Sequence, residues 1–271
     1  MKQSFLSVLC GSAVRILFRT HPGAPRKNPA PDCVKINRMA IEKNRPTVGY
    51  IIYGILWLLA CPALILFLSG DWSWIEGWVF VIWFLSMAVV SIVYLYRKDP
   101  ALLAERFRKP GSGNQKRWDK YLVYAMEIVF LAWFVIMPLD ARRYRWTTIF
   151  PLWLRVSGAA GLVISSSFLY RSYTDNTFAS PLIRIQTERK QRVVSTGVYG
   201  FVRHPMYLGG MLMFLCAPLL LSSRYGVLVG LIVSFALVGR IIGEEKMLLE
   251  ELEGYADYKK RVRYRLIPFV W

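Results

Sequence analysis

The sequence predicts an all-α integral membrane protein, a polytopic bundle of five to six transmembrane helices, and three observations support this class. Hydrophobic residues make up 55% of the 271 residues and charged residues only 19%, with a mean hydropathy of +0.35. Apolar runs with few charges recur along the chain, and each has about the length of 20 residues that is needed to cross a bilayer. Lys and Arg alternate between rich and poor connections, which is typical of membrane proteins whose basic loops stay in the cytoplasm.

Six runs are candidate spans, and they follow one another along the chain. In order, they are 48–68, 77–96, 121–139, 147–170, 205–223 and 225–242. The third run is interrupted by Glu127 and the fourth by Arg155, and we expect these lone charges on neighbouring spans to pair with each other. Residues 222–224, Ser-Ser-Arg, are predicted to form a tight turn between the last two spans.

The net charge of +18 is explained by topology. Of the 35 Lys and Arg residues, 30 fall in residues 1–47, 97–120, 171–204 and the part that begins at Arg240, which predicts that both termini are cytoplasmic. A nucleic-acid-binding protein of such charge would be more polar, so we expect membrane lipids and no nucleic acid as partners. The four Cys residues show no CxxC spacing, so we expect no metal site and no disulfide framework.

The chain divides into three parts by composition. We expect residues 1–47 to be a disordered cytoplasmic extension. A cleaved signal peptide is an alternative, although Arg15 falls in its would-be apolar core, and translation could instead start at Met39. Residues 48–170 hold the N-terminal spans with the cytoplasmic loop 97–120, and residues 171–271 hold the last two spans and the candidate site.

Two cytoplasmic segments contain helix-start signals. Pro100 favours a short amphipathic helix over 99–106, for which an interfacial connector is the simplest role. Pro205 favours a helix that begins near His204, with backbone N–H groups open to an anion. His204 and Tyr207 are three residues apart and project on one face of that helix. The alternative is a turn into the membrane whose basic side chains meet lipid headgroups.

The last span ends on charged residues. Arg240 and Glu244 are four residues apart and face the same way, and an intrahelical ion pair is their simplest role. Charges that faced lipid would be costly, so we expect Glu244 and the adjacent Glu245 to face a polar cavity at the cytoplasmic end.

These residues resemble the isoprenylcysteine carboxyl methyltransferase family and its bacterial-type relatives, which are membrane-embedded methyltransferases. The resemblance covers residues 99–106 and nearly all of 186–271. Its most specific part is an ordered set of motifs: Val-Val-Ser-Thr-Gly-Val-Tyr (193–199), Arg-His-Pro-Met-Tyr-Leu-Gly (203–209), Glu-Glu (244–245), Tyr255 with Tyr258, and Arg-Tyr-Arg-Leu-Ile-Pro (263–268). Residues 1–95 depart from the eukaryotic enzymes, which have additional N-terminal spans.

The resemblance implies an S-adenosylmethionine site in a cytoplasm-facing pocket formed by the last two spans and their flanking segments. By matching positions, the cofactor would be held by Gln186, Gln191, Val193, Val194, Tyr199, His204, Pro205, Met206, Tyr207 and Glu244. Arg240 falls where the family places a substrate-contacting arginine. The residue chemistry suits the cofactor, because a helix start can bind a carboxylate, Glu244 can accept from hydroxyl or ammonium groups, and an aromatic ring can face a sulfonium.

The function expected is carboxyl O-methylation of a lipophilic small-molecule or prenylated substrate, with S-adenosylmethionine as the methyl donor. One alternative is an NADPH-dependent reductase of the membrane sterol or steroid type, whose 2′-phosphate could bind Arg184, Arg189, Lys190 and Arg192. Another is a lipid-amine methyltransferase, which would need a base to take the proton of its acceptor. The last is a non-catalytic binding protein that uses the same pocket.

Overall fold

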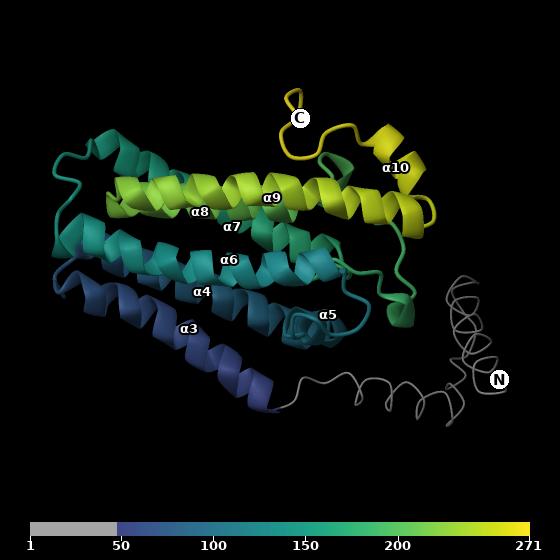
Figure 1. Cartoon of the computed structure of the whole chain (residues 1–271), viewed down its shortest axis with the longest axis horizontal. Helices are drawn as coiled ribbons and strands as arrows, with labels where there is room; N and C mark the ends of the chain where they lie inside the picture. The colour runs from purple at the N-terminus through teal and green to yellow at the C-terminus, as the bar shows by residue number, and fades with distance from the viewer. Residues whose placement is uncertain (1–47) are drawn as a thin grey trace, which may run out of the picture. The chain divides into compact units, whose positions relative to one another are not determined.

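The computed structural model describes residues 48–271, so the predicted extension 1–47 lies outside the described residues. The described chain is all-helical and contains no strand, which confirms the predicted fold class. Six long helices run side by side, as Figure 1 shows. They are α3 (Val48–Ser69), α4 (Ile75–Lys98), α6 (Arg117–Pro138), α7 (Leu152–Asp175), α8 (Pro205–Leu221) and α9 (Arg224–Glu251).

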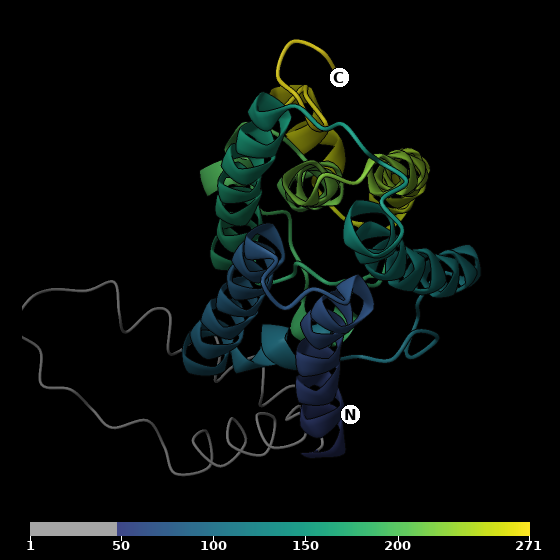
Figure 2. The same ribbon diagram turned by 90° about the vertical axis from the view of Figure 1, so that its left-hand side faces the viewer.

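Each of the six predicted apolar runs overlaps one of these helices, but α7 begins five residues after the start of the fourth run and α9 extends nine residues beyond the end of the sixth. Within the described residues, α4, α6 with the turn after it, α7 and α9 are long and apolar enough to cross a membrane. Helix α8 is the shortest of the six with 17 residues, and α3 has 22. The protein is therefore a multi-pass membrane protein, and Figure 2 shows its long helices end-on.

An aromatic cluster fills the centre of the bundle. Phe80 of α4, Trp133 and Phe134 of α6, and Phe214 of α8 belong to one buried core. The rings of Trp133 and Phe214 are 5.0 Å apart in an edge-on arrangement, which aromatic pairs favour. These large side chains come from three helices, and their contacts hold the first half of the chain against the second.

Small residues let α7 and α8 approach each other closely. A Cβ atom at Gly158 of α7 would lie only 2.4 Å from the backbone nitrogen of Leu220. Helices in membranes often pack through such glycines, because their backbones then come into van der Waals contact. The close contact holds the C-terminal part of α8 against α7.

The predicted pair between Glu127 and Arg155 is wrong. Arg155 instead donates to Glu76 at the start of α4, with 2.8 Å between Nη1 and Oε1. Glu76 also lies 3.7 Å from Arg142, which follows α6. Spacing along the chain shows that two lone charges are on adjacent spans, but it does not show which helices pack together.

A buried carboxylate organises the end of the bundle that is remote from the candidate site. Asp140, in the π-helical turn Leu139–Arg143, accepts hydrogen bonds from the Thr147 backbone N–H at 2.9 Å and the Ser223 hydroxyl at 2.6 Å. Ser223 also caps α9 by accepting from the Gly226 N–H at 2.9 Å. The predicted tight turn at 222–224 is confirmed, since α8 ends at Leu221 and α9 begins at Arg224.

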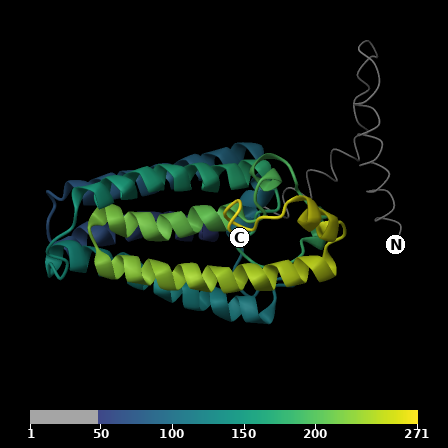
Figure 3. The same ribbon diagram turned by 90° about the horizontal axis from the view of Figure 1, so that it is seen from above.

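The opposite end of the bundle holds the short elements. Helix α9 has 28 residues and α8 has 17, so α9 projects beyond the start of α8 by about 16 Å at 1.5 Å per residue. Helices α5 (Pro100–Arg106) and α10 (Tyr255–Arg261) lie at this end, as do the single turns Thr187–Arg189 and Gly197–Gly200 (Figures 1 and 3). The predicted short helix is thus present as α5, and Asp99 caps it by accepting from the Leu102 N–H at 2.9 Å.

Candidate functional site

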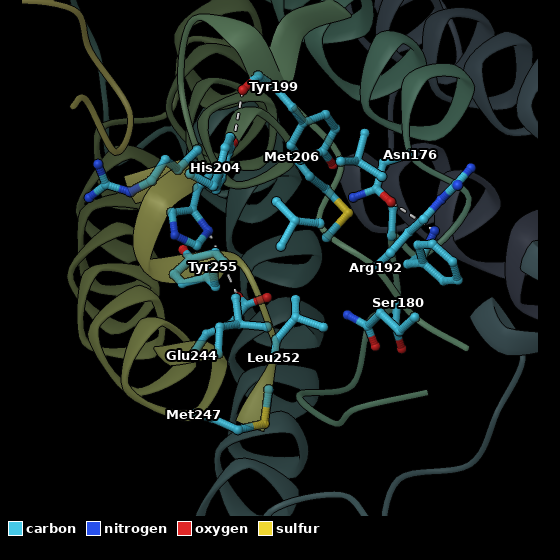
Figure 4. Close-up of a pocket in the computed structure, with 18 of the residues that line it drawn as sticks. Asn176, Ser180, Arg192, Tyr199, His204, Met206, Glu244, Met247, Leu252 and Tyr255 are labelled. Atoms are coloured by element: carbon cyan, nitrogen blue, oxygen red, sulfur yellow. Dashed lines mark hydrogen bonds and ion pairs between the residues drawn. The ribbon is translucent and has the colours of Figure 1, made fainter. Parts of the chain in front are cut away.

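A pocket opens at this end of the bundle, between the start of α8, the projecting part of α9, α10 and the connection that follows α7 (Figure 4). Its hollow measures about 740 Å³ with the open mouth included. Polar and apolar side chains both line it. They include Asn176, Ser180, Arg192, Tyr199, His204, Met206, Tyr207, Glu244, Met247, Leu252, Tyr255 and Tyr258.

The start of α8 is held in place by the C-terminal segment. The backbone N–H of Arg203 donates to the Tyr264 carbonyl at 3.0 Å, and that of His204 donates to the Arg265 carbonyl at 2.9 Å. His204 is the N-cap residue and Pro205 follows it in the first turn, as predicted. The side chain of His204 is therefore buried at a fixed position in the pocket wall.

The two adjacent acids at 244 and 245 have different roles. Glu245 is buried and accepts from Arg203 Nε at 2.7 Å and from Arg265 Nε at 3.0 Å, while His204 Nε2 lies 3.3 Å away. These contacts neutralise the carboxylate and tie three segments together. Glu244 instead lines the pocket, where it accepts from the Tyr207 hydroxyl at 2.6 Å. The acid that a ligand can reach is thus Glu244.

Three buried tyrosines supply neutral hydroxyl groups around the pocket. Burial raises the pKa of Tyr199, Tyr255 and Tyr258 above the ordinary value of 10.0, so each stays protonated at neutral pH. The Tyr258 hydroxyl donates to the Tyr199 carbonyl at 2.8 Å. The Tyr255 hydroxyl is buried and has no hydrogen-bond partner within the described chain. A buried hydroxyl without a partner is costly, and a bound ligand that accepted from it would remove that cost.

A charge network links the pocket to α5. Arg184 lines the pocket and donates to both oxygens of buried Glu105, at 2.7 Å from Nε and 2.8 Å from Nη2. Burial by itself would lower the pKa of Arg184, but its hydrogen bonds to Glu105 and Glu188 outweigh that effect and raise it. The hydrogen bond from Arg184 also lowers the pKa of Glu188. The bidentate contact holds the segment before 190 against α5.

The structure brings eight of the ten predicted cofactor residues together around this one pocket. They are Gln191, Val193, Val194, Tyr199, His204, Met206, Tyr207 and Glu244. Gln186 and Pro205 lie outside the lining. Gln186 is fully buried, donates to the Phe178 carbonyl at 2.9 Å and accepts from Arg189 at 2.7 Å, while its own N–H donates to the Gln191 side chain at 2.7 Å. Gln186 therefore supports the wall of the pocket from behind, and Pro205 is buried in the first turn of α8.

Arg240 also lies outside the pocket lining. Its Nε donates to buried Asp119 of α6 at 2.8 Å and its Nη2 to the Pro181 carbonyl at 2.6 Å. The guanidinium carbon is 5.7 Å from the centre of the Tyr207 ring, so Arg240 lies behind a residue of the pocket wall. The ion-pair partner of Arg240 is Asp119 on α6. This pair replaces the predicted intrahelical pair between Arg240 and Glu244.

Several lining residues were missed by the sequence analysis. Residues 176–180 carry no recognisable motif, and their approach to the pocket depends on the course of the connection after α7. Tyr255 and Tyr258, three residues apart on α10, were part of the resemblance but were not assigned to the cofactor site. Nothing in their spacing indicates which hydroxyl lacks a partner.

Residues 154–254 match the family described as phospholipid methyltransferase. The mouse protein Delta(14)-sterol reductase TM7SF2 is 31% identical over 105 residues, which are 38% of this chain and 25% of that protein. The chain thus spans about a quarter of the length of this curated relative.

One solved structure is similar over most of the chain. It is a eukaryotic intramembrane Ras methyltransferase, isoprenylcysteine carboxyl methyltransferase, with a TM-score of 0.44, 18% identity, and coverage of 81% of this chain and 86% of that one.

The family match covers α7, α8, α9 and the pocket residues between them. It agrees with the resemblance to membrane-embedded methyltransferases that the sequence motifs indicated. Residues 154–254 are thus similar to the phospholipid methyltransferase family.

Proposed function

We propose that this protein transfers a methyl group from S-adenosylmethionine to a carboxylate of a lipophilic or prenylated acceptor, as isoprenylcysteine carboxyl methyltransferases do. The observation that carries the proposal is the convergence of eight predicted cofactor residues, which are spread over 191–244, on a single pocket. The family match over 154–254 supports methyl transfer as the reaction class.

The polar groups of the pocket fit this cofactor. It carries a carboxylate, an ammonium, a sulfonium and ribose hydroxyls, so its site needs donors for the acid, an acceptor for the cationic or hydroxyl groups and aromatic surface. Glu244 is the acceptor, and Tyr199 and Tyr207 supply the rings. The unpartnered hydroxyl of Tyr255 is a donor that a bound oxygen or nitrogen atom would satisfy.

The residues of this chain would act by alignment. The cofactor supplies an already activated methyl group, and an acceptor carboxylate needs no base, so holding the two reactants in line supplies most of the rate. Arg240 is proposed to act from behind Tyr207 as a positioning residue for the acceptor side of the pocket, and Asp119 and the Pro181 carbonyl hold its guanidinium in one orientation. Tyr207 lies between Arg240 and Glu244, so it could separate the acceptor side from the cofactor side.

The membrane arrangement gives each reactant its own route. The pocket lies at the end of the bundle where the basic connections gather, which we propose to be cytoplasmic by the positive-inside rule. A polar cofactor would then come from the cytosol, and a hydrophobic tail would reach the site laterally from the bilayer.

A reductase is the second candidate, because the mouse relative that matches over 105 residues is a sterol reductase. A nicotinamide cofactor with a 2′-phosphate would need free basic groups. Arg184, one of the bases expected to serve, is taken up by Glu105 and Glu188. Arg192 lines the pocket and is the better candidate for such a phosphate.

Lipid-amine methylation is the third candidate, since the matching family is described as phospholipid methyltransferase. An amine acceptor must lose a proton during transfer, so a base has to lie beside it. His204 is the imidazole of the pocket wall, but its Nε2 lies 3.3 Å from Glu245 in a network that includes Arg203. That engagement favours a structural role and so favours the carboxylate acceptor.

One experiment separates the three reactions. Membranes that contain the protein are incubated with S-adenosylmethionine labelled in its methyl group, and the label is sought in base-labile esters, in phospholipids and in neither. Label in base-labile esters is the expected result. Label in phospholipid headgroups would show that the methyl acceptor is an amine and not a carboxylate. Absence of transfer together with tight NADPH binding to the purified protein would overturn the proposal.

Two variants test the assigned roles. We expect Glu244→Gln to lose cofactor binding while the fold is retained. Arg240→Ala would leave Asp119 buried without its partner, at a cost of about 3–5 kcal/mol, so the cleaner test is the double variant Arg240→Gln with Asp119→Asn. This variant should bind cofactor and lose turnover. Wild-type turnover in it would refute the role of Arg240.

A further inference from the structure

The C-terminal segment 262–271, here called the strap, turns back from α10 and lies against the bundle near the start of α8 (Figures 1 and 3). It is attached at several points. Arg203 Nη1 donates to the carbonyls of Val262 and Arg263, both at 2.7 Å. Leu266 is buried in the central core, and Trp271 packs against the same core. The strap is therefore a fixed part of the fold.

Three side chains of this fixed strap nonetheless project outward. Ile267 is 49% exposed, Phe269 is 89% exposed and Val270 is 75% exposed. Phe201 is also 75% exposed. It lies two residues before Arg203, whose backbone N–H donates to the Tyr264 carbonyl of the strap. Isolated apolar side chains are common on protein surfaces, but several together on one rigid segment indicate a contact surface.

The position of these side chains indicates what they contact. The strap is paired with the residues that directly precede α8, so it lies at the level where α8 begins, which the predicted span 205–223 assigns to the membrane interface. Basic residues Lys260, Arg261 and Arg263 are exposed on the polypeptide just before the apolar group. Apolar side chains beside Lys and Arg are the pattern of segments that lie in the membrane interface and attract anionic headgroups.

We propose that the strap is an interfacial anchor, in which Ile267, Phe269 and Val270 insert into the lipid boundary and the neighbouring basic residues bind anionic headgroups. Arg265 of the strap also pairs with Glu245 at 3.0 Å, beside His204 in the pocket wall. Insertion would thus fix the wall of the pocket at a defined depth relative to the bilayer. This inference does not depend on the reaction that the pocket performs.

The test measures the depth of the strap in a membrane. The four native cysteines are replaced by Ala, and Phe269→Cys or Val270→Cys is labelled with an environment-sensitive fluorophore. Asp257→Cys is the matched control, because its side chain is 78% exposed on the polar helix α10. The variants are reconstituted into vesicles of phosphatidylcholine with phosphatidylglycerol, and quenching by iodide is compared with quenching by doxyl-labelled lipid.

At 269 and 270 we expect a blue shift, loss of iodide quenching and strong quenching by doxyl lipid, whereas the label at 257 should respond to iodide. Equal iodide quenching at all three positions would overturn the proposal. Shielding of 269 and 270 from both quenchers would also overturn it, because a second copy or another protein would then cover the strap. Replacing Arg261 and Arg263 by Gln should reduce doxyl quenching only when phosphatidylglycerol is present, and an unchanged depth would refute the headgroup contact.

Discussion

Replacing Tyr255 by Phe removes a single buried hydroxyl whose effect has opposite signs in the free and the ligand-bound protein. In the free protein this hydroxyl has no hydrogen-bond partner, and the side chain is only 4% exposed. Leaving such a group buried costs about 1–3 kcal/mol. We therefore expect Tyr255→Phe to be more stable than the natural protein when no ligand is present.

The same change should weaken cofactor binding. If the hydroxyl donates to bound S-adenosylmethionine, its loss removes about 0.5–1.5 kcal/mol of binding free energy, which raises Kd about 2- to 12-fold. Thermal unfolding in detergent, measured with and without cofactor, reports both effects. The free variant should unfold at a higher temperature, by about 2–4 °C for each kcal/mol, and the stabilisation by cofactor should be smaller.

Tyr258→Phe is the matched control on the same helix. The Tyr258 hydroxyl is engaged by the Tyr199 carbonyl at 2.8 Å, so its removal should destabilise the free protein by about 0.5–1.5 kcal/mol. The two variants thus differ in the sign of their effect on the free protein. A lower unfolding temperature for Tyr255→Phe, together with an unchanged Kd, would refute the view that this hydroxyl awaits a ligand.

Two further predictions concern helix packing and pH. A Cβ atom at Gly230 would lie 2.3 Å from the Phe214 carbonyl oxygen, whereas one at exposed Gly239 would meet nothing within 4 Å. Gly230→Ala should destabilise the protein by about 1–3 kcal/mol and Gly239→Ala should not, as measured by denaturant or thermal unfolding. Burial raises the pKa of Tyr199, Tyr255 and Tyr258 above 10.0, so folding favours their protonated forms. The contribution of these tyrosines to stability should be constant below pH 10.0 and fall above it, by up to about 1.4 kcal/mol per pH unit for each tyrosine; an unfolding temperature that does not fall between pH 10 and pH 11 would contradict this.

Local signals account for the helix starts that the sequence predicted correctly near the site. Pro205 started α8 where a proline in the first turn was expected, and Pro100 with Asp99 did the same for α5. The convergence of residues 191–207 with Glu244 also agreed with the resemblance. Each of these depends on a few neighbouring residues or on an ordered set of motifs, and both can be read along the chain.

The sequence by itself determined the helical membrane class and the approximate limits of all six long helices, because apolar runs of this length have few other stable arrangements in a chain so poor in charge. Only the tertiary structure decided which charges pair. Arg155 contacts Glu76 and Arg240 contacts Asp119, and each pair joins helices distant in sequence. The reason is that an ion pair depends on which helices are neighbours and on how each is rotated, and those follow from the packing of the whole bundle.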